Sequence, residues 1–403
     1  MARDPTTRKR GSKKAADHPR GTKVDDGKTG RLKPPMTIEE IVARDNEPAS
    51  APVPSATAAR LSTRKVFFTA ARGAASRIQK AIRAAKTDEG SVAISLPAAV
   101  SPGLPGNHGS RVDLRSLYQL PGGEKDGGPS KPDWVPLVYH PKLGARPQRK
   151  PLRRFDGRRV VPVNESFIYG SDDRRVYYPQ GYPWHCIGKV EVFPNADSEY
   201  STSWGSGVLI GDRLVLTAGH VPPENPPPGQ WKMRFTAGLY NGSPVDGPGA
   251  ISYVSDFNGY LGGVSGVDYA VLRLYEPLGV DLGYFGWKTY SSDWNGGDYW
   301  WLAGYPFDIA GAQSPSYQSG IAVLDEDSDN GGLEIEHQGD VASGDSGGPF
   351  WGFWGGEPYV VGTTSGHEVI SGPSWVGGED NNIAAGGGAL SSLLNWGRTT
   401  WPL

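Results

Sequence analysis

The chain contains a single cysteine, Cys186, among 403 residues. An internal disulfide is therefore impossible, which excludes a small disulfide-stabilised scaffold, and Cys186 is expected to be a small buried apolar residue. No run of 18 apolar residues occurs, so a membrane-spanning helix is not expected. The basic start, MARDPTTRKRGSKKAADHPRG, has no apolar stretch behind it. We therefore expect no secretory signal peptide, and the compartment stays open.

The net charge of −2 hides a strong asymmetry along the chain. Residues 1–159 contain 32 Lys and Arg against 15 Asp and Glu, whereas residues 160–403 contain 9 against 28. Twelve of the 13 tryptophans also lie in the second part. Such a change in composition predicts two regions, a basic N-terminal extension over 1–165 and an acidic domain over 166–403.

The N-terminal extension is expected to be largely irregular and partly disordered, because residues 1–59 hold too little apolar surface to offset the entropy of ordering. The segment STRKVFFTAARGAASRIQKAIRAAK (62–86) has apolar residues every three to four positions and predicts a basic amphipathic helix. Docking of this extension on the acidic domain of the same chain is the favoured interpretation. Binding to nucleic acid or to a membrane surface is the less favoured alternative.

Residues 166–403 read as short strands separated by turns. Runs such as CIGKVEVFP, GSGVLIGDRLVLTAGH and YVVGTTSG alternate with clusters of Gly, Asn, Asp and Pro. This spacing predicts an all-β sandwich or barrel. One helix is expected at the end, in GALSSLLNWGR.

Three segments carry the residues of a nucleophilic hydrolase. Ser346 lies in SGDSGGP, a glycine turn that can aim the N–H groups of Gly344 and Ser346 at one point and so form an oxyanion hole. His220 ends the apolar run VLTAGH and is the candidate base. Asp268 opens the strand DYAVLRL and is the candidate acid that orients the histidine.

The order His220, Asp268, Ser346 decides between two hydrolase classes. GDSGG also satisfies the G-x-S-x-G elbow of α/β-hydrolases, but that elbow is followed by a helix and by its acid and histidine. Here a strand and turn, GGPFWGFWGGEPYVVG, follow the serine, and the candidate acid and base precede it. The elbow is therefore excluded.

VLTAGH, DYAVLRL and GDSGGP, in this order, resemble the catalytic segments of the chymotrypsin-like serine peptidases. IYGSDDRRVYYPQGYPWHCIGKV, YEPLGVDLGYFGWKTY and LAGYPFD are similar to the bacterial glutamyl endopeptidase branch of that family. The resemblance covers about 167–403 and implies two six-stranded antiparallel barrels with the catalytic triad between them. It also implies a polypeptide substrate, no cofactor or metal, and a precursor whose mature chain begins near Ile168. Members of the family are typically secreted.

The nucleophile motif departs from the glutamyl branch at Asp345 and Gly348, which follow the trypsin pattern. In trypsin-like enzymes that aspartate pairs with a newly cut amino terminus, and Ile168 is the candidate partner. Thr364 stands where the glutamyl branch places a histidine that receives the substrate carboxylate. The specificity pocket is expected to involve Asp340 together with Thr364, Ser365, Gly366 and His367.

Asp340 lies six residues before Ser346, the offset at which trypsin-like enzymes carry the aspartate that binds substrate Arg or Lys. A preference for Arg or Lys is therefore expected, with Glu as the second choice through His367 and His337. The segment DEDSDNGGLEIE (325–336) matches part of a calcium-loop pattern, but a solvated acidic hairpin is favoured. Two alternatives to a peptidase stay open, namely a catalytically inactive binding module and a nucleic-acid-binding arm that carries an attached protease.

Overall fold

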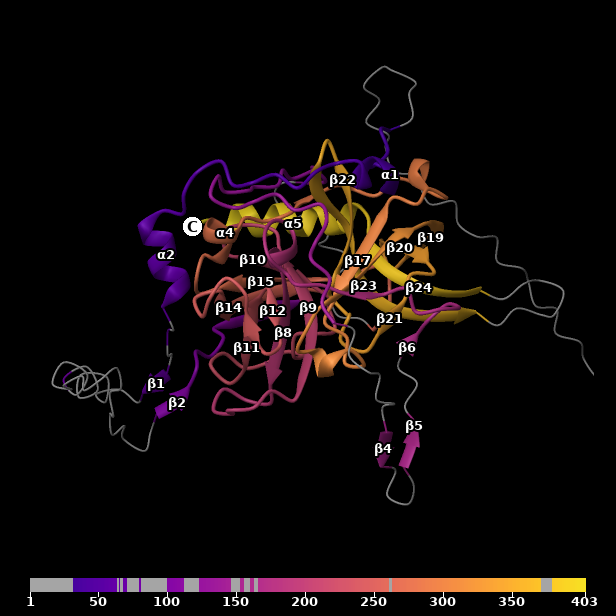
Figure 1. Ribbon diagram of the computed structural model, residues 1–403. Helices are drawn as coiled ribbons and strands as arrows, with labels where there is room; N and C mark the ends of the chain where they lie inside the picture. Colours follow the sequence, from indigo (N-terminus) through magenta and orange to yellow (C-terminus); the bar gives the residue numbers. More distant parts are fainter. Residues whose placement is uncertain are drawn as a thin grey trace, which may run out of the picture. The chain divides into compact units, whose positions relative to one another are not determined.

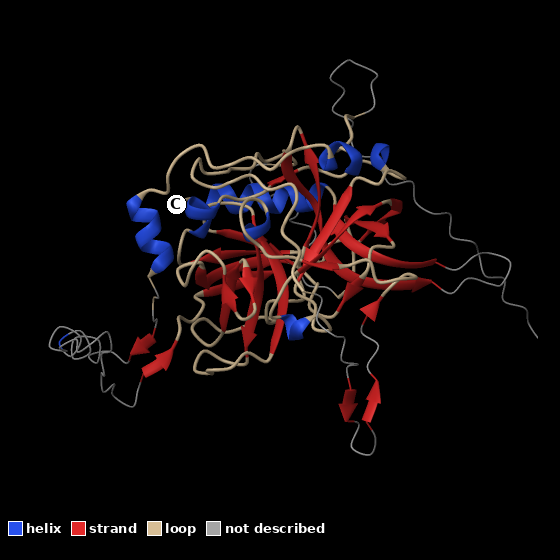
Figure 2. Cartoon of the chain, viewed as in Figure 1, coloured by secondary structure: helices blue, strands red, loops and turns tan. Residues whose placement is uncertain are grey.

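The computed structural model describes residues 32–63, 65, 68–70, 80, 100–111, 123–145, 153–155, 160–162, 166–260, 263–370 and 379–403. The chain divides into two compact units, Met1–Lys33 and Pro34–Leu403, and the second contains nearly all of the described residues. Strands dominate this unit, and Figure 2 shows them as two groups with few helices. The all-β class expected from the sequence is confirmed.

The first sheet closes into a six-stranded antiparallel barrel of order β11-β8-β9-β10-β15-β14, because β11 also pairs with β14. Strand β3 pairs in parallel with residues 256–259 of β14. A short hairpin of β12 and β13 follows β11. The bounds are β3 (His108–Arg111), β8 (Ile187–Phe193), β9 (Ser203–Leu209), β10 (Leu214–Thr217), β11 (Lys232–Ala237), β12 (Leu239–Tyr240), β13 (Ser243–Pro244), β14 (Ile251–Gly259) and β15 (Ala270–Leu274).

The second large sheet has the order β19-β20-β24-β23-β22-β17-β18-β7, with β16 paired to β23, and its strands other than β7 follow the barrel in sequence. In Figure 1 the barrel strands lie on the left and this sheet on the right. The bounds are β7 (Arg175–Val176), β16 (Gly286–Trp287), β17 (Trp300–Gly304), β18 (Ser316–Ile321), β19 (Val323–Asp329), β20 (Gly332–His337), β22 (Pro349–Trp354), β23 (Glu357–Ile370) and β24 (Glu379–Gly386).

One apolar core extends across both sheets. Val190 and Leu216 of the barrel belong to the same buried cluster as Trp301 and Trp351 of the second sheet. The C-terminal helix α5 (Gly388–Thr400), which the sequence predicted, contacts β10 and β15 as well as β20 and β24. Both sheets are therefore packed against a common interior. The other helical turns of this part are α4 (Leu278–Leu282), η2 (Trp184–Cys186), η3 (Ser292–Trp294) and η4 (Ala310–Ala312).

Parts of the N-terminal region belong to the same compact unit as the barrel. Helix α1 (Ile38–Val42) begins at a capping box in which Thr37 and Glu40 bond each other's backbone N–H. Helix α2 (Ser55–Ser62) follows, and the segment 123–145 forms isolated β-bridges, such as Leu137 to Tyr182 and Gly127 to Trp287 of β16. Apolar side chains of this region, among them Ile41 and Tyr139, are fully buried.

The helix predicted over 62–86 is wrong at Phe68–Ala70, which form strand β1 and pair with β2 (Val100–Pro102). The run Val66, Phe67, Phe68, Thr69 is β-branched and aromatic, which favours a strand over a helix. Most of the remaining predicted helix, 71–79 and 81–86, lies outside the described residues. Two further strand pairs are present. Strand β4 (Arg153–Phe155) pairs with β5 (Val160–Pro162) before residue 166, and β6 (Ser166–Phe167) pairs with β21 (Val341–Ala342).

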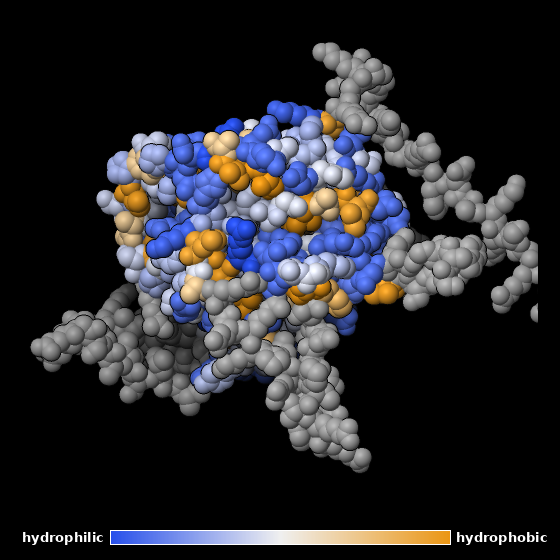
Figure 3. All heavy atoms as spheres, turned by 45° about the vertical axis from the view of Figure 1, so that its right-hand side comes forward, coloured by the Kyte–Doolittle hydropathy of each residue, from blue (hydrophilic) through white to orange (hydrophobic). Residues whose placement is uncertain are grey.

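On the face drawn in Figure 3, hydrophilic residues predominate and hydrophobic ones form small separate patches. The large apolar side chains that are exposed among the described residues, such as Leu143, Val264 and Leu324, are scattered along the sequence. Within the part of the chain that the structure describes, no helix is long and apolar enough to cross a membrane.

Candidate active site

His220 lies in the turn that follows strand β10, where the apolar run ends. Its backbone N–H donates to Asp268 Oδ1 at 2.9 Å, and its Nδ1 lies 2.7 Å from Asp268 Oδ2. Gly219 makes this approach possible, because a Cβ there would lie 3.0 Å from Asp268 Oδ1 and 2.8 Å from the Tyr260 carbonyl oxygen. The imidazole is partly exposed, whereas Asp268 is fully buried. The Nδ1 bond holds the proton on that nitrogen and leaves Nε2 as the basic atom.

Asp268 accepts a third hydrogen bond from the Ser365 hydroxyl, at 2.6 Å from Oδ2. A buried carboxylate requires such donors, because an unpaired charge in the interior is costly. The sequence assigned Ser365 to the specificity pocket, and the structure places its hydroxyl on the acid that orients His220. Ser365 is thus a hydrogen-bond partner of Asp268, a contact that the sequence did not predict.

Ser346 lies on a tight turn that both sheets hold in place. Ser206 of β9 donates its N–H to the Ser346 carbonyl at 2.7 Å and its hydroxyl to the Gly344 carbonyl at 2.7 Å. On the other side, Gly347 N–H donates to Thr364 O at 2.8 Å. Thr364 precedes Ser365, so this register places the Ser346 turn beside the Asp268–His220 pair. The Ser346 turn and the Asp268–His220 pair are therefore each bonded to one of two adjacent residues of β23.

The glycines of this turn are required by its geometry. Gly347 has φ 86°, and a Cβ there would lie 2.2 Å from Thr217 Oγ1. Gly344 has φ 101°, and its Cβ would lie 2.5 Å from the Tyr305 carbonyl oxygen. The N–H groups of Asp345 and Gly347 donate to the carbonyl oxygens of Ala342 and Thr364. Among the described residues, the N–H groups of Gly344 and Ser346 have no hydrogen-bond acceptor. These two groups are available to an oxyanion.

Asp340 is buried, and its carboxylate accepts two backbone hydrogen bonds from the chain that precedes β7. Tyr169 N–H lies 3.0 Å from Oδ1, and Asp173 N–H lies 2.8 Å from Oδ2. No Lys, Arg or His of the described residues forms an ion pair with it. The carboxylate is therefore buried with neutral donors around it.

The side chains of the other predicted specificity residues differ in their surroundings. The Phe167 ring stacks on the His367 ring with centroids 3.7 Å apart, and His367 Nε2 lies 3.3 Å from Asp380 Oδ1. Thr364 is buried and its hydroxyl oxygen has no hydrogen-bond partner among the described groups. His337 is fully buried, and burial lowers its pKa to about 3, which leaves the imidazole neutral.

Ile168 lies just after β6, and in the part of the chain that the structure describes it forms no ion pair or side-chain hydrogen bond with Asp345. The charged group nearest to the Asp345 carboxylate is the guanidinium of Arg174, whose Nη1 is 3.7 Å from Oδ2. Arg174 was not among the site residues predicted from the sequence. The run DDRR (172–175), which places an arginine beside acidic residues in an otherwise aromatic segment, was the available signal.

The acidic segment 325–336 forms the predicted hairpin, since β19 and β20 pair in antiparallel register. Among the described residues no group of three or more His, Cys, Asp or Glu side chains could hold a metal ion.

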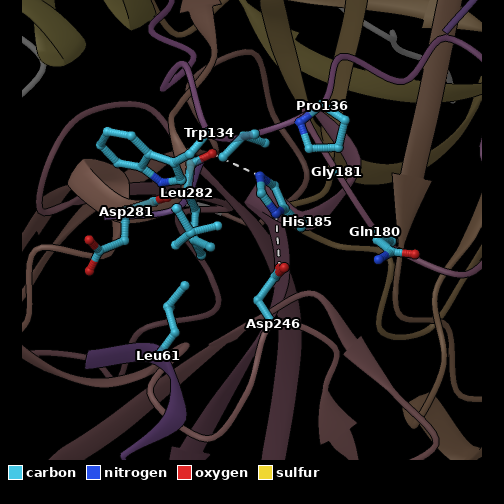
Figure 4. A pocket seen from close by; sticks show the side chains of 11 residues that line it. Leu61, Trp134, Pro136, Gln180, Gly181, His185, Asp246, Asp281 and Leu282 are labelled. Atoms are coloured by element: carbon cyan, nitrogen blue, oxygen red, sulfur yellow. Dashed lines mark hydrogen bonds and ion pairs between the residues drawn. The ribbon is translucent and has the colours of Figure 1, made fainter. Parts of the chain in front are cut away.

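A hollow of about 110 Å³ lies away from the triad, between N-terminal segments and the barrel (Figure 4). His185 reaches into it, bonded to Asp246 Oδ2 at 2.9 Å and to the Leu282 carbonyl oxygen at 2.8 Å. Burial opposes the charge of this imidazole, but Asp246 raises its pKa well above the ordinary value. Both ring nitrogens are engaged, so His185 is a satisfied structural residue.

Residues 205–353 match the family model of the trypsin-like peptidase domain. A glutamyl endopeptidase of Bacillus licheniformis is 26% identical over 203 residues, which are 47% of this chain and 56% of that protein. An extracellular metalloprotease of Bacillus subtilis is 23% identical over 231 residues, 53% of this chain and 69% of that protein. The chain thus spans little more than half the length of the first relative.

Two solved structures are also similar to this chain. A Glu endopeptidase in complex with MPD has a TM-score of 0.43 at 22% identity and covers 58% of this chain and 99% of its own. The protease Anisep from Arthrobacter nicotinovorans has a TM-score of 0.41 at 20% identity, with 55% and 97% covered.

Proposed function

We propose that this chain, a trypsin-like serine peptidase, cleaves peptide bonds through Ser346, His220 and Asp268. The observation that carries the proposal is the buried Asp268, bonded to His220 and adjoining a turn whose Gly344 and Ser346 N–H groups are unengaged. A hydroxyl alone is a weak nucleophile, and this arrangement supplies the base, the acid that orients the base, and the donors for the developing negative charge.

In the proposed reaction, Ser346 Oγ attacks the carbonyl carbon while its proton moves to His220 Nε2. The carbonyl oxygen becomes an oxyanion that the N–H groups of Gly344 and Ser346 bind. The C–N bond then breaks as His220 gives its proton to the leaving amine, which leaves an acyl-enzyme. Water next attacks this ester, His220 takes the water proton, and Ser346 regains a proton when the carboxylic acid leaves.

A fluorophosphonate probe tests the nucleophile, because it phosphonylates an activated serine and releases fluoride. We expect one phosphonyl group per chain, located on Ser346 by peptide mass spectrometry. Ser346→Ala is the control and should not react. A chain that folds, judged by circular dichroism, and yet does not label would overturn the enzyme and favour an inactive binding module.

We propose a preference for Arg or Lys before the scissile bond, carried by Asp340. Its buried carboxylate has only neutral N–H donors among its described partners, Tyr169 and Asp173, so a cationic side chain would supply the missing counter-charge. The name of the Bacillus licheniformis relative supports Glu as the second candidate. The acidic residues near the site, such as Asp380, disfavour a Glu side chain by repulsion.

A peptide library separates the two preferences. We expect cleavage after Arg or Lys, and Asp340→Ser should abolish that preference while hydrolysis of a neutral ester continues. Asp340→Asn is the matched control that keeps the shape and one acceptor oxygen. Cleavage after Glu by the unmodified chain would contradict the assignment of Asp340.

We further propose that the chain is a precursor that is cut near Ile168. Phe167, which lies before such a cut, supports this, since its ring stacks on His367, a residue assigned to substrate recognition. The N-terminal region is proposed to stay docked on the peptidase domain rather than to bind nucleic acid. The uncut chain should react with the small fluorophosphonate probe but cleave peptides slowly, and cutting near Ile168 should raise peptide hydrolysis. Equal peptide hydrolysis before and after cutting would contradict the precursor.

A further inference from the structure

A buried arginine lies against the aspartate of the nucleophile turn. Arg174 directly precedes β7, and its side chain is 1% exposed. Its guanidinium binds Asp172 with Nε and Nη2, each at 3.1 Å, and Asp308 with Nη1 at 3.1 Å and Nη2 at 2.6 Å. Nη1 also lies 3.7 Å from Asp345 Oδ2. One cation thus faces three carboxylates.

The Arg174 guanidinium stabilises the ionised form of the Asp345 carboxylate. The side chain is fully buried, and Oδ1 has no hydrogen-bond partner among the described groups. Burial raises the pKa of Asp345 to about 7, Arg174 and the Ala342 N–H oppose that rise, and Asp308 adds to it. Without the guanidinium, an ionised Asp345 would be a buried charge with a single backbone donor, which is strongly unfavourable.

Asp345 in turn shapes the catalytic turn. Its Oδ2 accepts the Ala342 N–H at 3.0 Å, and its own N–H donates to the Ala342 carbonyl at 2.9 Å. These bonds close the turn between Ala342 and Asp345, and Asp345 stands between Gly344 and Ser346. The direction of the two proposed oxyanion donors therefore depends on where the Asp345 carboxylate is held.

We infer that Arg174 is a positioning residue, which holds Asp345 and through it the Gly344 and Ser346 N–H groups, in place of a newly cut amino terminus. This inference rests on the proposed peptidase function. Arg174 is present in the chain before and after a cut near Ile168, so the oxyanion donors are aligned in the uncut protein. Cutting then changes access to the substrate-recognition residues and leaves the catalytic turn as it was.

A purely structural role for Arg174 is the competing account, since the arginine also ties Asp172 and Asp308 together. The two accounts differ in what happens when Asp345 carries no charge. If Arg174 acts by balancing Asp345, the benefit of the arginine disappears once Asp345 is neutral. If Arg174 only joins Asp172 to Asp308, its loss has the same effect with or without a charge at position 345.

The test is a double-mutant cycle on the uncut full-length chain, read as the rate of labelling by a fluorophosphonate probe. Loss of one oxyanion donor typically costs about 10²–10³ in rate, so Arg174→Met should slow labelling by about 10²-fold or more. In the Asp345→Asn background the same change should have little effect. Arg174→Lys, which keeps the charge, should retain more activity than Arg174→Met. Arg234→Met, which breaks the Arg234–Glu191 pair on the barrel, is the matched control.

Two further readouts separate positioning from general damage. With a peptide substrate, Arg174→Met should lower kcat while KM changes little, because the oxyanion forms only in the transition state. The pH at which labelling rises should move upward in Arg174→Met, since Asp345 then faces Asp308 without the guanidinium and ionises later. A displaced fold would instead alter the thermal unfolding of all Arg174 variants alike.

The outcomes are distinct. Absence of labelling in the unsubstituted chain overturns the peptidase itself. Normal labelling by Arg174→Met, or the same loss in both backgrounds of the cycle, overturns the positioning role and leaves the peptidase intact. If Arg174→Met does not fold, Arg174→Gln, which removes the charge but keeps hydrogen-bond donors for Asp172 and Asp308, replaces it in the same cycle.

Discussion

The buried carboxylate of Asp268 is stabilised by hydrogen bonds that also orient His220. Its two oxygens receive the His220 N–H, His220 Nδ1 and the Ser365 hydroxyl. Three donors compensate for the lost hydration of the carboxylate, and one of them is the imidazole that must be oriented. The same bonds therefore serve the stability of the fold and the proposed chemistry.

Asp268→Asn should lower kcat by about 10⁴-fold, because the amide no longer holds the required imidazole tautomer. Burst and steady-state kinetics with an ester substrate measure this loss. Ser365→Ala is the informative comparison. Its free energy of unfolding should fall by about 1.5–3 kcal/mol for the lost bond to a charged group, while kcat falls far less than in Asp268→Asn. Equal losses of kcat in the two variants would contradict these separate roles.

At the scale of secondary-structure elements, the hairpin β19–β20 places carboxylate side chains directly opposite one another on its two strands. Asp325 lies opposite Glu336, and Asp327 lies opposite Glu334. Like charges directly across a pair of strands are destabilising. Asn381 relieves Glu336 by donating to its Oε2 at 2.6 Å. Glu334 is 8% exposed, and burial raises its pKa to about 7, with Asp329 and Glu368 adding to the rise.

Glu334→Gln should stabilise the protein increasingly as the pH rises above the ordinary pKa of about 4.5, with the full gain above about pH 7. Because the folded-state pKa lies above the ordinary value, the favourable protonated form is complete at low pH, and its contribution is lost as pH rises through about 7. We expect equal free energies of unfolding for both proteins near pH 4 and a gain of about 1–3 kcal/mol for Glu334→Gln near pH 8. Urea titrations across this range measure it. The exposed Glu199→Gln is the control, and a gain that is independent of pH would contradict the explanation.

At the scale of the whole molecule, the N-terminal region contacts residues 166–403 mainly through backbone and apolar groups. The opposite charges of the two regions predicted an electrostatic association. Among the described residues, however, only a few ion pairs link the regions, such as Arg60–Asp281 and Lys65–Glu276, and Asp126–Lys288 has the reverse polarity. Buried side chains such as Ile41 and Tyr139 supply the larger contribution.

This difference predicts that the association resists salt. A full-length chain that carries an inserted site for a specific protease between Phe167 and Ile168 would be cut and passed through a size-exclusion column. The two pieces should elute together even at about 1 M NaCl, where the Debye length is about 3 Å. Asp281→Asn, which removes the partner of Arg60, should change this little. Separation of the pieces at high salt and not at low salt would restore the electrostatic explanation.

Several features of this protein are decided by short stretches of sequence. VLTAGH, DYAVLRL and GDSGGP each combine an apolar strand or a glycine turn with one reactive residue, and the order of the three excluded the elbow of the α/β-hydrolases. The alternation of short strands and turns likewise indicated the all-β class. These are local properties, because strand and turn preferences act over a few residues. The same reasoning was wrong at Phe68–Ala70, where a basic amphipathic pattern also suited a strand.

The surroundings of the charges were decided only by the tertiary structure. Asp340 is hydrogen-bonded to Tyr169, 171 positions away in the sequence, and Ser365 to Asp268, 97 positions away. Arg174, near the start of the region 166–403, forms an ion pair with Asp345. No local pattern specifies such pairs, because they depend on the register of strands in two sheets and on the path of the chain between them. The sequence alone predicted which residues carry the proposed chemistry. Tertiary packing determined which neighbours hold them, since the cost of a buried charge is met by whatever donor or cation the fold brings to it.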